Sequence, residues 1–134
     1  MEQVTNRKAL VVDDNKINQL VARVMLEKLG WDVDLACHGS EGLRKASEQA
    51  YAVILMDFQM PEMDGAEATR LIRASGGPSR KAVIIGISAS GERTICIEAG
   101  MNDFLLKPMF LSDLVGIIDR NLVGAEDKGD STCC

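Results

Sequence analysis

The chain has 134 residues, of which 46% are apolar and 4% aromatic, and its formal net charge is −5. This length suits one domain with a single core, filled by aliphatic side chains and methionine. No apolar run approaches the roughly 20 residues of a membrane-spanning helix, and the N-terminus has no hydrophobic signal region. The acidic balance, with no basic cluster longer than Arg80–Lys81, argues against nucleic-acid binding. We therefore expect a cytoplasmic domain that contacts neither nucleic acid nor membrane.

Five short apolar runs alternate with segments of helical period along the chain. The expected strands are Ala9–Val12, Asp32–Ala36, Ala52–Met56, Ala82–Ile87 and Asp103–Leu106. These runs are rich in Val, Ile and Leu and mostly lack alternation, as do parallel strands that are buried on both faces. Strands that alternate with helices predict right-handed crossovers, and hence a single α/β domain with a doubly wound parallel sheet.

The first helix is expected to begin after Asp14–Asn15, where Asn15 can cap it, and to end at Leu29–Gly30. Its apolar side chains recur with helical spacing and form one stripe: Ile17, Leu20, Val21, Val24 and Met25. The other expected helices are Ser40–Gln49, Asp64 or Gly65 to Ile72, Gly91 or Glu92 to Gly100, and Leu111–Leu122. Residues 1–7 are expected to form an N-terminal extension and residues 124–134 a disordered polar tail.

Polar residues follow the ends of four predicted strands. Asp13 and Asp14 follow the first strand, Asp57 the third, Ser88 the fourth and Lys107 the fifth. Because ligands of parallel α/β sheets bind at the carboxyl ends of the strands, these five side chains are expected to form one site.

The chemistry of this predicted site favours a divalent cation and a phosphoryl group. Asp13, Asp14 and Asp57 repel one another at close range unless a hard cation such as Mg²⁺ lies among them. A carboxylate can attack phosphorus to form an aspartyl-phosphate, and Lys107 is suited to neutralise charge on the phosphoryl oxygens. The Ser88 hydroxyl can donate to a phosphoryl oxygen, and the small Ala89 beside it leaves room.

Four motifs occur together in a specific order: Asp13–Asn15, Met56–Gly65, Ser88–Ala89 and Lys107–Pro108. On these motifs the chain resembles a response-regulator receiver domain of two-component phosphorelays, over about residues 8–123. It is most similar to receivers attached to hybrid sensor histidine kinases. The resemblance implies a flavodoxin-like (βα)5 fold with strand order 2-1-3-4-5.

The same resemblance implies roles for individual residues. Asp57 would be the phosphoacceptor, and Mg²⁺, or Mn²⁺ in its place, would be held by Asp14, Asp57 and the backbone carbonyl of Gln59, with Asp13 acting mostly through water. Lys107 would pair with the phosphoryl group, Ser88 would follow the phosphate, and Phe104 would be the aromatic switch residue. Ala89 and Pro108 would be neighbours of the phosphoryl site. The Lys107–Pro108 bond resembles one that the family often keeps cis.

The implied partner is a histidine kinase or a histidine-phosphotransfer protein, and the domain is expected to be a monomer or weak dimer, within a membrane-anchored hybrid kinase or alone. His38, the single histidine, falls in a predicted loop, so the chain is expected to accept a phosphoryl group rather than donate one from histidine. The four cysteines, Cys37, Cys96, Cys133 and Cys134, lack CxxC spacing and are expected to stay reduced.

Two departures from the family pattern stand out. The span from Ser88 to Gly100 is shorter than usual by roughly one helical turn, which predicts a truncated fourth helix or entry loop. Phe110 stands where a small capping residue is common, so Ser112 or Asp113 is expected to cap the fifth helix unless that turn is irregular.

Two other functions remain open from the residues alone. The chain could be a receiver-like interaction module with weak or no phosphorylation, which the short fourth helix favours. It could also be a phosphatase with an aspartate nucleophile, but such enzymes tend to place a second acid two residues later, where Gln59 stands here. A dinucleotide site is disfavoured because no GxGxxG follows the first strand.

Overall fold

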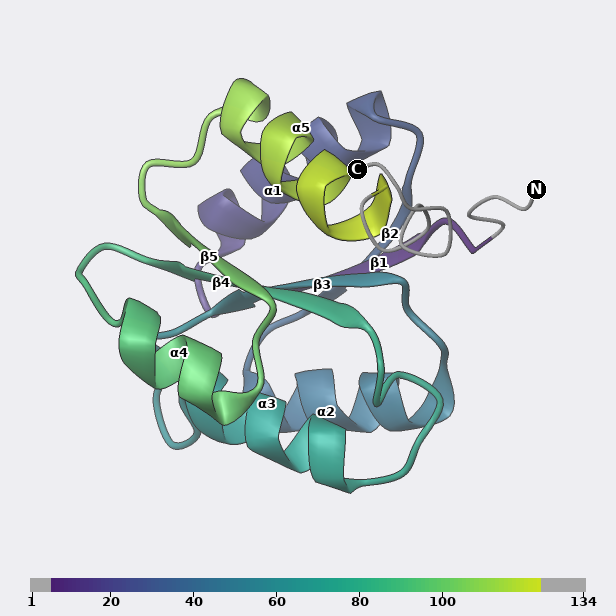
Figure 1. Cartoon of the computed structure of the whole chain (residues 1–134), viewed down its shortest axis with the longest axis vertical. Coiled ribbons are helices and arrows are strands. Elements are labelled where there is room, and N and C mark those ends of the chain that lie inside the picture. The colour runs from purple at the N-terminus through teal and green to yellow at the C-terminus, as the bar shows by residue number, and fades with distance from the viewer. Residues whose placement is uncertain (1–5, 124–134) are drawn as a thin grey trace.

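The computed structural model describes residues 6–123, in which five parallel strands form one sheet with helices on both faces (Figure 1). The strands are β1 Lys8–Val12, β2 Asp32–Ala36, β3 Val53–Asp57, β4 Val83–Ser88 and β5 Asp103–Leu106. Their order is β2-β1-β3-β4-β5, and all neighbouring pairs are parallel. The predicted fold class and strand order are therefore confirmed, with each predicted strand placed within one residue.

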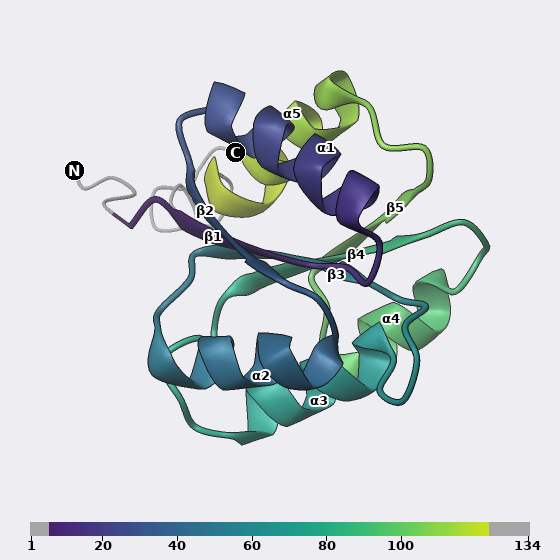
Figure 2. The ribbon, with the colours of Figure 1, turned by 180° about the vertical axis from the view of Figure 1, so that it is seen from behind.

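The helices divide into two layers around the sheet (Figures 1 and 2). One layer contains α1 Lys16–Lys28 and α5 Leu111–Ile118, and α5 continues as a π-helical turn over Asp119–Val123. The other contains α2 Gly39–Glu48, α3 Gly65–Ala74 and α4 Arg93–Ala99. At seven residues, α4 is the shortest α-helix within residues 6–123. None of the helices within residues 6–123 is long and apolar enough to cross a membrane.

Each strand feeds two separate cores, which explains why the apolar runs do not alternate. In β3, Ile54 and Met56 pack into the core beneath α2, α3 and α4. Val53 and Leu55 pack into the core beneath α1 and α5. Phe104 belongs to the first core and is 9% exposed. A strand that is buried on both faces needs apolar residues at every position.

Several predicted helix ends are confirmed by their hydrogen bonds. The Oδ1 atoms of Asn15 and Asp64 accept backbone N–H groups three residues later, at 2.9 and 2.8 Å, and so cap α1 and α3. Gly30 follows α1 with a φ of +92°, a conformation that favours glycine. At α5, Asp113 accepts the backbone N–H of Phe110 at 3.3 Å, as predicted for one of the two candidate capping residues.

Most of the predicted apolar stripe of α1 is exposed, although Met25 at its end packs against the core beneath α1 and α5. Ile17, Leu20 and Val24 are 71%, 54% and 50% exposed. The residues that face the sheet are instead Gln19, Ala22 and Leu26. Gln19 Nε2 donates to the backbone carbonyls of Asp13 and Ala36, at 2.6 and 3.2 Å, where β1 and β2 end. These buried hydrogen bonds fix the rotation of the helix and turn the stripe outwards.

Candidate functional site

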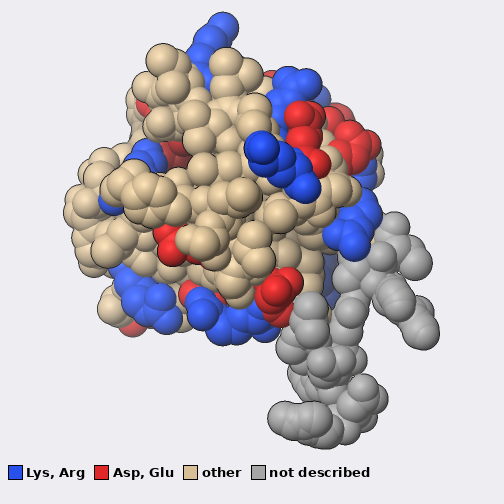
Figure 3. All heavy atoms as spheres, turned by 90° about the horizontal axis from the view of Figure 1, so that it is seen from above, with Lys and Arg blue, Asp and Glu red and all other residues tan. Residues whose placement is uncertain are grey.

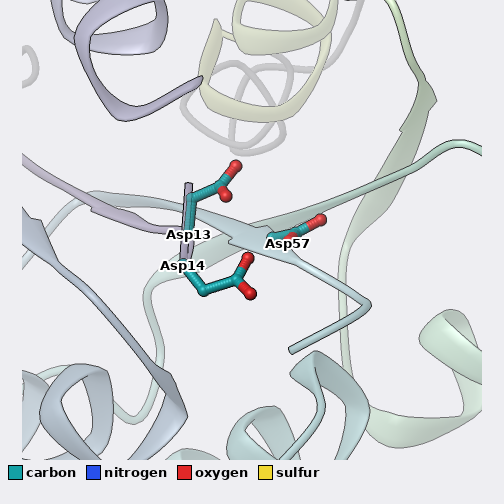
Figure 4. A group of neighbouring side chains, drawn as sticks. All are labelled: Asp13, Asp14 and Asp57. Carbon is teal, nitrogen blue, oxygen red and sulfur yellow. The ribbon is translucent and has the colours of Figure 1, made fainter. Parts of the chain in front are cut away.

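Three carboxylates meet at the carboxyl ends of two neighbouring strands (Figure 4). Asp13 and Asp14 follow β1, and Asp57 is the last residue of β3, which pairs with β1. One carboxylate oxygen from each lies within 4.8 Å of the others, an arrangement that could hold a metal ion. Asp13 and Asp57 are buried, whereas Asp14 is exposed. A hard cation with oxygen ligands fits this donor set.

Asp57 is the most perturbed of the three carboxylates. Its residue is 3% exposed, and this burial, with the nearby charge of Asp13, raises its pKa to about 6. Lys107 Nζ lies 3.1 Å from Asp57 Oδ1, and its positive charge lowers the pKa of Asp57 in part. Oδ1 is itself buried and accepts no hydrogen bond of good geometry from residues 6–123. The carboxylate is therefore held in a position where a further positive charge would stabilise its ionised form.

Hydrogen bonds hold both the side chain and the backbone carbonyl of Asp13. Its Oδ1 accepts the N–H of Asn15 at 2.9 Å, and its carbonyl accepts Gln19 Nε2. Burial raises the pKa of Asp13 despite that hydrogen bond and the charge of Lys107. Asp13 and Asp57 thus share a buried region in which two ionised carboxylates oppose each other.

A cavity of about 380 Å³ opens beside Asp57, between α1 and the segment that follows β5. Asp13, Asp57 and Lys107 supply its charged lining, and the apolar side chains of Val21 and Met109 contribute to its walls. Pro108 also lines the cavity, and the Lys107–Pro108 peptide is cis, as the sequence resemblance implied.

The loop between β3 and α3 packs tightly against the end of β3. A Cβ atom at Gly65 would collide with the backbone carbonyl of Asp57, so this position requires glycine. Gln59, whose carbonyl was the predicted third metal ligand, lies in this loop with an exposed side chain. The Pro-Glu-Met-Asp-Gly sequence thus brings the chain directly from Asp57 into α3.

The predicted residues at the end of β4 are arranged differently from the carboxylates. Ser88 is 1% exposed, and its hydroxyl donates to a carboxylate oxygen of Glu92. The Ser88 side chain is therefore already occupied, and it does not line the cavity beside Asp57. Ala89 is exposed, next to Ser88. The structure thus brings Asp13, Asp14, Asp57 and Lys107 together and directs Ser88 to a separate acidic partner.

Two residues of this region were not predicted from the sequence. Gln19 looked like a polar position within a helix, and its burial was not expected. Glu92 was considered only as the start of α4. The one available signal was that Glu92 follows Ser88 by four positions across a predicted turn, a spacing that is too common to identify a contact.

A parallel sheet with this strand order has the flavodoxin-like fold, and the acidic cluster at its carboxyl edge is a candidate metal centre. The sequence model of the response regulator receiver domain family matches residues 9–119, most of the chain. The chain therefore belongs to the response regulator receiver domain family.

Relatives of known sequence place such domains within larger kinases. The chain is 37% identical over 124 residues to hybrid signal transduction histidine kinase F of Dictyostelium discoideum, an alignment that covers 88% of the chain. It spans 11% of that kinase's length.

Two solved structures share the fold. The receiver domain of sensor histidine kinase PA1611 from Pseudomonas aeruginosa, with magnesium coordinated in its active-site cleft, is 41% identical with a TM-score of 0.79. That match covers 90% of this chain and 99% of the other. The receiver domain of Ssk1, in complex with the histidine phosphotransfer protein Ypd1 of Saccharomyces cerevisiae, is 27% identical with a TM-score of 0.79. That match covers 90% of this chain and 91% of the Ssk1 chain.

Proposed function

We propose that the chain accepts a phosphoryl group on Asp57 from a phosphohistidine, in a reaction that depends on Mg²⁺, and thereby switches or relays a signal. The observation that carries the proposal is the environment of Asp57. Its Oδ1 is buried without a hydrogen bond from the described residues, 3.1 Å from the Lys107 ammonium and beside two further carboxylates. Asp57 thus lines the cavity, where a phosphoryl donor can reach it, and its position is fixed by β3 and the contact with Lys107.

The chain's own groups have distinct parts in the reaction. A carboxylate oxygen of Asp57 attacks phosphorus, and the bond from phosphorus to the donor imidazole breaks with its electron pair leaving on nitrogen. Lys107 neutralises charge that develops on the phosphoryl oxygens. Slow attack of water on the aspartyl-phosphate would later release phosphate, so the domain is a self-modifying acceptor rather than a conventional turnover enzyme.

Asp13, Asp14, Asp57 and the carbonyl of Gln59 are the proposed metal-binding groups, with Asp13 acting mostly through water. Mg²⁺, or Mn²⁺ as a substitute, would offset the mutual repulsion of the carboxylates and the charge of the phosphoryl group. The PA1611 receiver, which holds magnesium in its active-site cleft, supports this assignment. Phe104, buried near β4 and α4, is proposed as the aromatic switch residue.

The proposed donor is a histidine kinase or a histidine-phosphotransfer protein that docks on the α1–α5 layer. The exposed apolar stripe of α1 borders the cavity through Val21, and much of the face seen in Figure 3 carries neither acidic nor basic side chains. The Ypd1–Ssk1 complex supports a partner of this kind. We further propose that the domain itself is a monomer or weak dimer and binds no nucleic acid, in keeping with its net charge of −5.

The test is intact-mass measurement after incubation with Mg²⁺ and acetyl phosphate. We expect the mass of one phosphoryl group on the wild type and none on Asp57→Asn. Asp32→Asn, which changes an exposed aspartate at the other end of the sheet, is the matched control and should be labelled like the wild type. Equal labelling of Asp57→Asn would show that the acceptor is a different residue. An unlabelled wild type would favour an interaction module without phosphorylation.

A further inference from the structure

The hydrogen bond from Ser88 to Glu92 points to a function for an acidic residue outside the carboxylate cluster. Ser88 ends β4, and Glu92 immediately precedes α4, with three residues between them. We propose that Glu92 is a positioning residue, which holds the Ser88 hydroxyl away from the phosphoryl site until Asp57 is phosphorylated. This inference rests on the proposed function, because it concerns when Ser88 becomes available to the phosphoryl group.

The Ser88 side chain is fully engaged in the described structure. Its hydroxyl proton points to Glu92 Oε1, and its oxygen accepts the backbone N–H of Ser90 at 3.2 Å. A hydroxyl has one proton to donate, so Ser88 cannot donate to Glu92 and to a phosphoryl oxygen at the same time. A carboxylate is a stronger acceptor than a neutral group, which makes Glu92 an effective competitor for that proton.

The Glu92 side chain is not needed to form its own helix. Glu92 occupies the capping position of α4, but its side chain accepts no capping hydrogen bond. At the equivalent positions of α1 and α3, Asn15 and Asp64 do accept such bonds. Glu92 also has no ion-pair partner within residues 6–123. Within residues 6–123, the side chain of Glu92 therefore hydrogen-bonds to Ser88 alone, and removing the carboxylate leaves the capping of α4 unchanged.

The competition links the chemistry at Asp57 to the position of α4. A phosphoryl group on Asp57 would offer new anionic oxygens to Ser88, while the released Glu92 carboxylate, which is half-buried, could be solvated. The hydroxyl of Ser88 thus has two arrangements, one bonded to Glu92 and one bonded to a phosphoryl oxygen. A phosphoryl group on Asp57 shifts the equilibrium towards the second. The bond between Ser88 and Glu92 ties the end of β4 to the start of α4. Its loss would therefore release the short segment that leads into α4.

The experiment measures the apparent affinity of the domain for beryllofluoride in the presence of Mg²⁺, by amide NMR titration. Beryllofluoride mimics a phosphoryl group on aspartate without a covalent labelling step. If the population free to donate to the mimic rises, the apparent dissociation constant falls in proportion. We expect Glu92→Ala to bind about three- to tenfold more tightly than the wild type, with Glu92→Gln between the two because its amide oxygen is a neutral acceptor.

Two controls separate this function from a general charge effect. Glu98→Ala removes the same charge from an exposed position of α4 and should leave the affinity unchanged. In a Ser88→Ala background, Glu92→Ala should give no gain, because no hydroxyl remains to be released. A gain that persists in that background would mean that Glu92 acts through its charge, and would overturn the proposal. So would a wild-type affinity in both Glu92 variants.

The two proposals fail in different ways. A wild type that binds no beryllofluoride and takes no phosphoryl mass would overturn the proposed function, and with it any basis for the role of Glu92. A wild type that is labelled on Asp57, with Glu92 variants that bind the mimic as it does, would overturn only the role of Glu92. The Ser90 amide signal gives a direct readout, because its N–H donates to Ser88 Oγ and should shift in Glu92→Ala but not in Glu98→Ala.

Discussion

Helices α1 and α3 both carry apolar residues at helical spacing, but they use them in opposite ways. In α3, Ala68 and Ile72 are 0% and 1% exposed and pack into the core. In α1, Ile17 and Leu20 are 71% and 54% exposed. The comparison shows that helical periodicity identifies an apolar face without identifying what covers that face. The apolar residues of α3 stabilise the domain, whereas the stripe of α1 remains available to a partner.

One polar side chain in each of the two helices donates hydrogen bonds to backbone carbonyls outside its helix. The guanidinium of Arg73 in α3 donates to the backbone carbonyls of Gly100, Arg80 and Ala82 at 2.9, 2.8 and 2.7 Å. In α1, Gln19 donates to the carbonyls that end β1 and β2. Each side chain satisfies carbonyl groups at a specific end of the sheet, so its position fixes which residues of the helix face inwards.

The strongest test of the contrast is a pair of identical substitutions. Ile72→Ala should lower the free energy of unfolding by roughly 2–4 kcal/mol, because it leaves a cavity in a packed core. Ile17→Ala should change that free energy by no more than about 0.5 kcal/mol, because its side chain already faces water. Urea unfolding followed by circular dichroism measures both. Similar losses in the two variants would mean that the α1 stripe is covered in solution.

The second test concerns the side chain that orients α1. Gln19→Leu should lower the free energy of unfolding by roughly 1–3 kcal/mol, because the carbonyl of Asp13 loses the Gln19 donor and that of Ala36 keeps only the N–H of Asp13. Lys16→Leu, at an exposed position of the same helix, is the control and should have a much smaller effect. If Gln19→Leu proves neutral in urea unfolding, the apolar contacts of Ala22 and Leu26 would be sufficient to orient α1.

The third test concerns the buried carboxylates near α1. Their ionisation destabilises the folded state, whereas the apolar core beneath α3 stabilises it. The pKa of Asp57 is about 6, above its ordinary value of 3.8. Between those values the folded state binds more protons than the unfolded state, so stability falls as pH rises through this window. Asp57→Asn should therefore raise the free energy of unfolding at pH 7 by roughly 1–2 kcal/mol in metal-free buffer.

This gain should shrink as the pH is lowered towards 4, where Asp57 is increasingly protonated in both states. Thermal unfolding in the presence of EDTA at a series of pH values provides the measurement. Asp32→Asn should show no comparable gain at pH 7, because its carboxylate is exposed. A gain for Asp57→Asn that is the same at pH 4 and pH 7 would rule out ionisation as its cause.

The sequence predicted the carboxylate site well because strand ends and topology together determine it. Asp13, Asp14, Asp57 and Lys107 each follow or end a strand of one parallel sheet, so chain order alone places them at one edge. The rotation of α1 and the bond from Ser88 to Glu92 could not be predicted in this way. Both depend on which acceptor a polar side chain reaches across a turn or a helix–sheet interface, and local patterns do not encode that choice.

The last test concerns a substitution that should change function while leaving stability almost unchanged. Leu20→Ala, in the exposed stripe of α1, should change the free energy of unfolding by no more than about 0.5 kcal/mol. If a phosphohistidine partner docks on α1, this substitution should lower the apparent second-order rate constant of phosphoryl transfer by about fivefold, through loss of roughly 1 kcal/mol of contact. Labelling by acetyl phosphate should be unchanged, because a small donor needs no docking surface.

The matched control for this last test is Leu71→Ala in α3, which removes the same side chain from a position that is 39% exposed. Its rates with the protein donor and with acetyl phosphate should both match those of the wild type. Equal losses with the protein donor in the Leu20 and Leu71 variants would show that the donor does not distinguish the two helices. A loss confined to the Leu20 variant would show that the stripe left uncovered by the rotation of α1 is the surface on which the phosphoryl donor docks.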